Sequence, residues 1–313
     1  MGTTALVFSL RLVDYESQRL TNKLFQRSSQ PAFLIGHIMI PKIGTRKSKL
    51  ALVYTGIAKE AIKMELEIVL IDSTADLNPT TSIEEMGGKG VFTKEIEQAL
   101  IDGDIDIACH AFKDLTRDND HILEIPCVVK RGDVRDCLVG NEVNPRTIGT
   151  SSPRRISQLK DLYPNAEIIP IRGNLDTRIN KVDNGEYDAI CVAKAGLDAV
   201  LRSHRASRIF GTADMMPAPG QGVIALQMRS DNRMKGALSN MNHWNTWYMA
   251  MAEKYMLKEI DGNCQTPVGS VSVYDGDNIK IIAKNFETNK IAVQSAPYKE
   301  YRELGQMLGS QLI

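Results

Sequence analysis

Nothing in the overall charge of this sequence points to a polyelectrolyte as a partner. Lys and Arg together number 38, Asp and Glu also number 38, and the formal net charge is zero. A protein that binds nucleic acid or an anionic membrane through bulk electrostatics carries an excess of basic residues. We therefore expect no nucleic acid and no membrane among its partners. Any anion site has to be built locally, from placed Arg and Lys side chains.

Cysteine is scarce, and its spacing is irregular. The sequence has an odd, dispersed set without a C-x-x-C pair: Cys109, Cys127, Cys137, Cys191 and Cys264. This pattern argues against a disulfide framework and a zinc site, and it indicates a reducing compartment. We predict a cytoplasmic protein that holds no metal.

Long apolar runs and targeting patterns are missing as well. No run reaches the roughly 18 residues that a membrane-spanning helix needs. The first 38 residues include Asp14 and Glu16 and lack the layout of a signal peptide. We predict that residues 1–38 are an extension outside the folded core, and organelle targeting is the alternative for this segment.

The rest of the chain alternates strand and helix patterns, and it does so twice. Ile43-Gly44-Thr45 is echoed by Ile148-Gly149-Thr150, and residues 106–111 are echoed by residues 188–193. Alternating strands and helices predict parallel sheets in βαβ units. We expect two α/β lobes whose ligand lies in a cleft beyond the carboxyl ends of the strands.

The last region of the sequence has a different pattern. A helix predicted over residues 247–260 precedes three strand patterns at 268–274, 279–286 and 290–296, and a helix begins near Tyr298. This order predicts a small α+β domain with a three-stranded antiparallel sheet. The predicted domains are residues 39–130 with 218–240, residues 131–217, and residues 241–313.

Cationic residues recur where strands end or helices begin. Ser152 and Pro153 suit the N-cap and first position of a helix, and two arginines follow them directly. A helix N-terminus and forked guanidinium donors both favour an anion. The seven cations placed this way are Arg46, Lys89, Lys113, Arg154, Arg155, Arg172 and Arg178. They predict a multiply charged anionic ligand, unless internal carboxylates pair with some of them.

Three further residues could carry chemistry. Asp114 follows a predicted strand end, where it could accept and return protons, stabilise a cationic intermediate, or instead cap a helix start. His110 ends the same strand and is more often structural in such a place. Cys264 stands in a tight loop, Asp261 to Gly269, in which Gly262 suits the turn that ends the helix. Its thiol is either presented to the cleft or a small apolar filler, and the other four cysteines are predicted to lie in the core.

From about Ile43 to Gly269 the sequence resembles the porphobilinogen deaminase family, also called hydroxymethylbilane synthases. The resemblance rests on blocks that occur in order: 43–46 with Ser48, 87–95, His110 with Lys113-Asp114, Arg135-Asp136, 148–155, 172–178, 187–190, 217–222, and Cys264-Gln265 with Pro267. It implies two lobes like those of periplasmic binding proteins and a third domain that carries a cofactor thiol. It also implies a monomer.

The resemblance implies a transferase that joins four porphobilinogen molecules head to tail into 1-hydroxymethylbilane, with loss of ammonia, for tetrapyrrole and haem biosynthesis. A dipyrromethane cofactor is expected on Cys264 through a thioether. The catalytic carboxylate is expected to be Asp114. The resemblance assigns cofactor carboxylates to Lys113, Ser152, Arg154 and Arg155, and the substrate to Arg46, Ser48, Arg172, Arg178 and Lys89. The product is expected to pass to uroporphyrinogen-III synthase.

Several positions depart from the family pattern: Glu85, Ala111, Gly132, Val134, Pro153 and Ala199. Because Glu85 and Ala199 each stand where a cation is common, we expect weaker substrate binding or slower elongation rather than inactivity. Two alternatives stay open, a non-catalytic bilobal anion-binding protein with an added domain and a degenerate member of the family.

Overall fold

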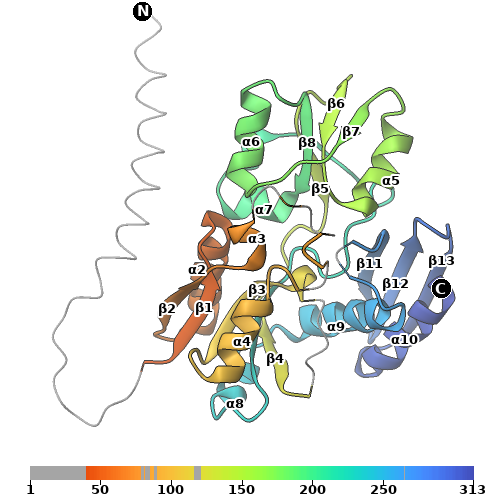
Figure 1. Ribbon diagram of the computed structural model, residues 1–313. Helices are drawn as coiled ribbons and strands as arrows, with labels where there is room; N and C mark the ends of the chain where they lie inside the picture. The colour runs from red at the N-terminus through yellow and green to blue at the C-terminus, as the bar shows by residue number, and fades with distance from the viewer. Residues whose placement is uncertain (1–39, 79–80, 82–84, 88–89, 116–120, 264) are drawn as a thin grey trace, which may run out of the picture. The chain divides into compact units, whose positions relative to one another are not determined.

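A computed structural model describes residues 40–78, 81, 85–87, 90–115, 121–263 and 265–313. The predicted extension at residues 1–38, Lys89 and Cys264 lie outside these ranges. The described chain contains three sheets with their helices (Figure 1). No helix in the described ranges is long and apolar enough to cross a membrane.

The first two sheets have the same layout. The first has the order β2-β1-β3-β10-β4, formed by Glu67–Ile71, Lys42–Arg46, Ile107–Ala111, Ile224–Arg229 and Leu123–Val128. The second has the order β7-β6-β8-β5-β9, formed by Glu167–Ile169, Thr147–Gly149, Ala189–Ala193, Asp136–Gly140 and Ala206–Ile209. The repeated motifs therefore occupy equivalent places, since β1 matches β6 and β3 matches β8. This confirms the two predicted α/β lobes.

The prediction of parallel sheets is wrong for one inserted strand in each lobe. Strand β10 runs antiparallel to both of its neighbours, β3 and β4. Strand β5 likewise runs antiparallel to β8 and β9. Each inserted strand directly follows a crossing, a segment in which the chain passes from one sheet to the other. The crossings are residues 129–135 before β5 and residues 210–223 before β10. The inserted strands enter from the opposite direction, and antiparallel pairing needs no crossover helix.

Helices pack against both sheets. The first lobe has α2 Lys49–Ile62, α3 Thr74–Leu77, α4 Lys94–Asp102 and α8 Lys235–Asn240, and the second has α5 Pro153–Leu162, α6 Leu175–Asp183 and α7 Lys194–Ala199. Short 3₁₀ turns, η2 Phe112–Asp114 and η3 Ser203–Arg205, follow β3 and α7. Ser48 caps α2, because its Oγ accepts a hydrogen bond from the Ala51 N–H at 3.3 Å.

Two short features complete the first lobe. Helix α3 lies within the polar segment that follows β2 and carries a capping box between Ser73 and Asp76. Helix α4 starts at Lys94, because residues 91–93 form a turn.

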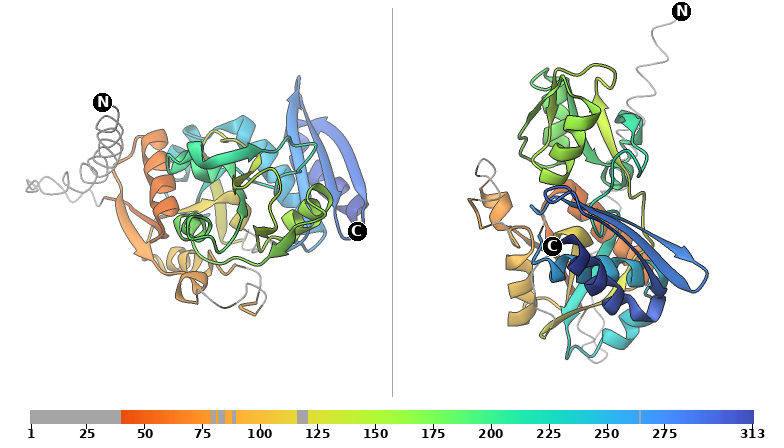
Figure 2. Two further views of the ribbon diagram at one scale, coloured as in Figure 1. Left: turned by 90° about the horizontal axis from the view of Figure 1, so that it is seen from above. Right: turned by 90° about the vertical axis from the view of Figure 1, so that its right-hand side faces the viewer.

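The third domain has the predicted antiparallel sheet. Its elements are α9 Trp244–Glu259, β11 Val268–Asp275, β12 Asn278–Asn285, β13 Ile291–Pro297, η4 Tyr298–Glu300 and α10 Tyr301–Leu312. Helix α10 covers one face of the sheet (Figure 2), where Leu304 and Leu308 join Ile279 and Ile281 in one buried cluster. Gly305 lets α10 approach α9 closely, since a Cβ there would lie 2.5 Å from the Ala252 carbonyl oxygen.

The two crossings between the lobes meet at a buried ion pair with the third domain. The Gly132 N–H donates to the Gly222 carbonyl at 2.8 Å. Arg131 makes two bonds to Glu253 of α9, at 2.9 and 3.0 Å, and the Glu253 side chain is fully buried. Glu253 also accepts from the Gly220 N–H at 2.5 Å. One carboxylate therefore holds both crossings against α9. The predicted domain boundaries themselves stay predictions.

We expect Glu253→Gln to lower the free energy of unfolding by about 3 kcal/mol, because Arg131 is left as a buried cation without a counterion. Urea unfolding followed by tryptophan fluorescence measures this, since both tryptophans lie on α9. Asp231→Asn is the matched control, because the Arg229–Asp231 pair is exposed. Equal unfolding curves for the two variants would contradict the role given to Glu253.

Candidate functional site

A cavity of about 500 Å³ draws its walls from both lobes and from the third domain. Every described residue that the sequence assigned to a site lines it: Arg46, Ser48, Lys113, Asp114, Ser152, Arg154, Arg155, Arg172 and Arg178. Asn263, Gln265 and Thr266 from the loop after α9 line it as well. Lys89 and Cys264 are not described, so their places are open.

The fold explains why residues so far apart in sequence meet here. Arg46 ends β1, Asp114 closes the turn after β3, Ser152 precedes α5, and Arg172 lies between β7 and α6. All four positions are at carboxyl ends of parallel strands or at the helix starts that follow them. Such ends gather at one edge of an α/β sheet, where ligands bind.

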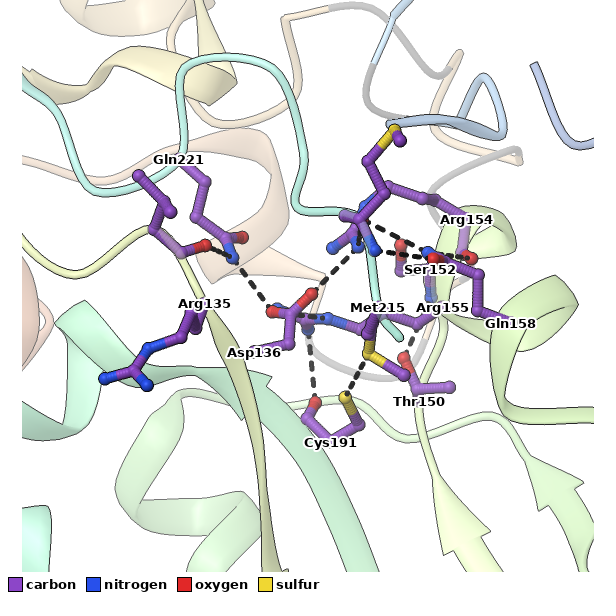
Figure 3. Close-up of polar contacts among 12 residues, drawn as sticks. Arg135, Asp136, Thr150, Ser152, Arg154, Arg155, Gln158, Cys191, Met215 and Gln221 are labelled. Carbon is purple, nitrogen blue, oxygen red and sulfur yellow. Dashed lines mark hydrogen bonds and ion pairs between the residues drawn. The ribbon is translucent and has the colours of Figure 1, made fainter. Parts of the chain in front are cut away.

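A buried carboxylate, Asp136, holds the two adjacent arginines (Figure 3). Its oxygens lie 2.8 Å from Arg154 Nη1 and 2.6 Å from Arg155 Nη2, and its side chain has no exposed surface. Burial alone would raise the pKa of Asp136, but the charges of Arg154 and Arg155 hold it well below its usual range. Arg135-Asp136 was among the blocks that carry the resemblance, but nothing in the sequence showed what Asp136 does.

Gln221 ties this cluster to the first lobe. Its side-chain amide donates to Asp136 at 2.9 Å and to the Val134 carbonyl at 2.8 Å, and its Oε1 accepts from the Lys113 ammonium at 3.1 Å. Burial, with the nearby Arg155 charge, lowers the pKa of Lys113 to about 8. Lys113 is therefore a cation at neutral pH whose position is set by a neutral partner.

Ser152 precedes α5 as predicted, and Pro153 is the first helical residue. The expected side-chain cap is not made, since the Ser152 hydroxyl bonds no N–H group of the first turn. Ser152 instead donates its backbone N–H to Thr150 Oγ1 at 3.2 Å. Because the hydroxyl lies in the cavity wall without a role in the helix, it is available to a ligand.

Arg46 is also paired with a carboxylate inside the cavity. Its Nε and Nη2 atoms lie 2.9 and 2.5 Å from the two oxygens of Asp76. Its guanidinium carbon lies 4.9 Å from the ring centre of Phe92. Burial opposes ionisation of Asp76, but its bonds to Arg46 and Ser73 lower its pKa to about 2. The alternative that internal carboxylates neutralise some of the cations is therefore correct for Arg46, Arg154 and Arg155.

Arg172 and Arg178 differ, because neither has a carboxylate partner in the described part of the chain. Arg178 donates from Nε to the Gly173 carbonyl at 2.7 Å. Burial, followed by repulsion from Arg155, Arg172 and Arg46, lowers the pKa of Arg178 to about 10. The buried Nε of Arg172 finds no acceptor among the described residues. These two guanidiniums carry positive charge that the described protein does not neutralise.

Asp114 is the last residue of η2 and lies partly buried in the cavity wall. Burial raises its pKa, while the positive charges of Lys113 and Arg46 oppose the rise. Within the described residues, Ala111 is the N-cap of η2 and no side-chain cap bond is made there, so the alternative that Asp114 caps a helix start stays open toward residues 116–120, which are not described. His110 lies inside β3, is buried and does not line the cavity, and burial lowers its pKa to about 4.

The loop around Cys264 is held by its two flanks. The Asn263 N–H donates to Thr266 Oγ1 at 2.9 Å, and the Gln265 N–H donates to Asn263 Oδ1 at 2.7 Å. Asp261, not Gly262, adopts the left-handed conformation that ends α9, with φ of 49°. Gly262 matters for packing, since a Cβ there would lie about 3.1 Å from the Ile260 side chain. The other four cysteines are buried, as predicted.

Known proteins match this chain over most of its length. Residues 41–236 match the family model "Porphobilinogen deaminase, dipyromethane cofactor binding domain", and residues 247–313 match "Porphobilinogen deaminase, C-terminal domain". The chain belongs to the porphobilinogen deaminase family. A porphobilinogen deaminase of Acetivibrio thermocellus is 39% identical over 80% of this chain and 88% of its own length. One of Alkaliphilus oremlandii is 36% identical over 87% and 94%.

Solved structures align less closely than these relatives. A substrate-binding domain of a putative amino acid ABC transporter from Streptococcus pneumoniae is 11% identical, with a TM-score of 0.40 over 64% of this chain and 91% of that chain. The VFT2 domain of Bordetella pertussis BvgS is 15% identical, with a TM-score of 0.36 over 64% and 86%. Likeness at this level carries no argument about the site.

The family assignment makes this chain a transferase with a dipyrromethane-binding domain, as the motif blocks predicted. The cavity has the chemistry that such an acidic cofactor needs. Six cationic side chains line it against two carboxylates, and the buried Nε of Arg172 has no acceptor in the described chain. The residues present therefore fit a ligand that carries several carboxylates.

We expect Asp136→Asn to destabilise the fold at pH 7 by about 3–5 kcal/mol, because it leaves two buried guanidiniums without a counterion. The folded pKa of Asp136 is depressed, so its stabilisation is fully present above the unfolded pKa of about 4 and is lost as the pH falls toward the folded value. The advantage of the wild type over the variant should therefore be constant from pH 7 to 5 and shrink below about pH 4.

Urea unfolding at pH 7, 5 and 3 measures this difference. Asp133→Asn is the control. Asp133 lies three residues before Asp136, and its partner Arg135 is more exposed than Arg154 and Arg155. A difference between the wild type and Asp136→Asn that does not change with pH would contradict the ionic role of Asp136.

Proposed function

We propose that this chain is a porphobilinogen deaminase that condenses four porphobilinogen molecules head to tail into 1-hydroxymethylbilane, releasing four ammonia molecules. The observation that carries the proposal is one cavity whose wall includes Asp114, uncompensated cations and both flanks of the Cys264 loop. A dipyrromethane joined to Cys264 by a thioether supplies the primer on which the chain of pyrroles grows.

Lys113, Ser152, Arg154 and Arg155 hold the cofactor carboxylates in this proposal. The two arginines contribute differently. Arg155 donates hydrogen bonds from Nε and Nη2 to Asp136 and from Nη1 to the Cys191 carbonyl. Arg154 uses only Nη1, on Asp136 and on the Met216 carbonyl at 2.6 Å. Because a guanidinium has five N–H donors, Arg154 keeps free donors for direct bonds, whereas Arg155 acts mainly through its charge.

Arg46, Ser48, Arg172, Arg178 and Lys89 bind the incoming substrate. Porphobilinogen carries an acetate and a propionate, so each addition brings two negative charges into the cavity. Arg172 and Arg178 suit this task because they have no internal counterion in the described chain, and a carboxylate relieves the repulsion between them. The guanidinium fork also matches a carboxylate with two parallel bonds.

Asp114 is the catalytic carboxylate in this proposal. It accepts hydrogen bonds from pyrrole N–H groups and stabilises the positive charge that develops on the substrate as ammonia leaves. Such stabilisation is strong in a partly buried site, where little water screens the charge. Lys113 and Arg46 favour the ionised form of Asp114 against the effect of burial. We further propose that the protein acts as a cytoplasmic monomer and passes its product to uroporphyrinogen-III synthase.

We expect the intact mass of gently purified protein to exceed the sequence mass by two linked pyrrole units, with the addition mapping to the Cys264 peptide. Cys191 is an internal control, since it is buried and should stay unmodified. The Cys264→Ser variant should show no addition. An unmodified Cys264 that persists after incubation with porphobilinogen and with preformed hydroxymethylbilane would favour the anion-binding or degenerate alternative.

We expect Asp114→Asn to lower the rate of ammonia release from porphobilinogen by a factor of about 10² or more, because charge stabilisation in the transition state is lost. The fold should survive, since asparagine keeps the size and shape of the Asp114 side chain. Asp161→Asn, on the exposed side of α5, is the control. Near-wild-type turnover of Asp114→Asn, with cofactor present by mass, would refute the assigned role.

A further inference from the structure

Arg46, which the proposed function assigns to substrate binding, forms an ion pair with Asp76. Both residues line the cavity, and about a quarter of each side chain is exposed, 23% for Arg46 and 24% for Asp76. The contact uses two guanidinium nitrogens and both carboxylate oxygens. This is the bidentate geometry that a substrate carboxylate would adopt on the same guanidinium.

From this geometry we propose that Asp76 is a built-in competitor, an internal carboxylate that a substrate carboxylate displaces from Arg46. This inference rests on the proposed function and assigns a specificity-determining role to a residue outside the predicted site set. Displacement exchanges one anion for another, so the charge on Arg46 stays neutralised throughout. Neutral or cationic molecules have no carboxylate to offer and leave the pair closed.

Arg46 has further contacts besides Asp76. Its guanidinium lies over the Phe92 ring, which attracts a cation. Its backbone is fixed in β1, where it pairs with Ile71. These contacts support Arg46 when its carboxylate partner changes.

Asp76 also has bonds that remain after the exchange. Its Oδ2 accepts from the Ser73 hydroxyl at 2.7 Å and from the Ser73 N–H at 3.2 Å, within the capping box of α3. The Ala75 N–H holds α3 to the Val91 carbonyl at 3.1 Å. The displaced carboxylate therefore keeps hydrogen-bond donors of its own, which makes the exchange less costly than leaving a charge unsatisfied.

If Asp76 competes with the substrate for Arg46, removing the charge of Asp76 should strengthen substrate binding. Asp76→Asn keeps the size of the side chain and one oxygen for the Ser73 bonds, but it removes the charge that neutralises Arg46. Arg46 then faces the cavity together with Arg172 and Arg178, and the three positive charges favour an incoming carboxylate. A partly exposed ion pair is weak, so we expect KM for porphobilinogen to fall about two- to fivefold with kcat unchanged.

The matched control is Asp72→Asn. Asp72 pairs with Lys47 at 2.5 Å, lies four residues earlier in the chain, and does not line the cavity. It removes the same charge from the same region, so any general effect of net charge on substrate encounter appears in both variants. KM of Asp72→Asn should match that of the wild type, and the gain in Asp76→Asn should shrink at high salt.

The outcomes separate the inference from the proposed function. If the wild type releases ammonia from porphobilinogen and KM of Asp76→Asn is unchanged or raised, Asp76 positions Arg46 and the competitor role is overturned. If the wild type releases no ammonia, calorimetric binding of succinate, a simple dicarboxylate, still tests the exchange. Tighter succinate binding to Asp76→Asn than to Asp72→Asn supports the role, and equal binding overturns it.

Discussion

The site depends on one buried carboxylate, Asp136. Two guanidiniums at the start of α5 have almost no exposed surface, and buried cations are tolerated only when they are paired and hydrogen-bonded. Asp136 meets this requirement from β5, a strand that enters the second lobe directly from a crossing. Its remaining bond goes to Gln221, on the other crossing. The carboxylate that makes the arginine pair possible therefore also fixes the pair relative to the segments that join the lobes.

The cations of the cavity fall into three kinds by their counterions. Arg154 and Arg155 share a permanent buried partner, which sets their geometry and leaves one net positive charge. Arg46 has a partner inside the cavity that a ligand can replace. Arg172 and Arg178 have none in the described chain, and their lowered pKa values reflect burial and repulsion from nearby arginines, Arg46 among them. A polyanionic ligand thus meets cations with a fixed counterion, one cation with an exchangeable counterion, and two cations without a counterion in the described chain. This range suits a ligand that gains negative charge with each addition.

The sequence predicted the elements and the composition of the site better than its internal pairing. Strand and helix periodicity located both lobes, and strand ends located the cations, because these signals are local. The partners of those cations were not predictable in the same way. Asp76 lies 30 residues from Arg46 and Asp136 lies 19 residues before Arg155, and only the folded sheets bring them together. Hydrophobic alternation also carries no strand direction, so the alternation of strands and helices predicted parallel sheets, although β5 and β10 run antiparallel to their neighbours.

The joint at Arg131 and Glu253 connects this chemistry to the third domain. Arg131 Nε donates to the Gln221 carbonyl at 2.9 Å, while the side chain of the same Gln221 bonds Lys113 and Asp136. Glu253 is on α9, the helix that leads into the Cys264 loop. The helix before the thiol loop and the cations of the cavity are therefore positioned through shared hydrogen bonds at Gln221. In a domain joined by a free hinge, the position of such a loop relative to the cavity would vary. Here the bonds of Arg131 and Glu253 fix α9 relative to the two crossings, and so they fix the start of the Cys264 loop.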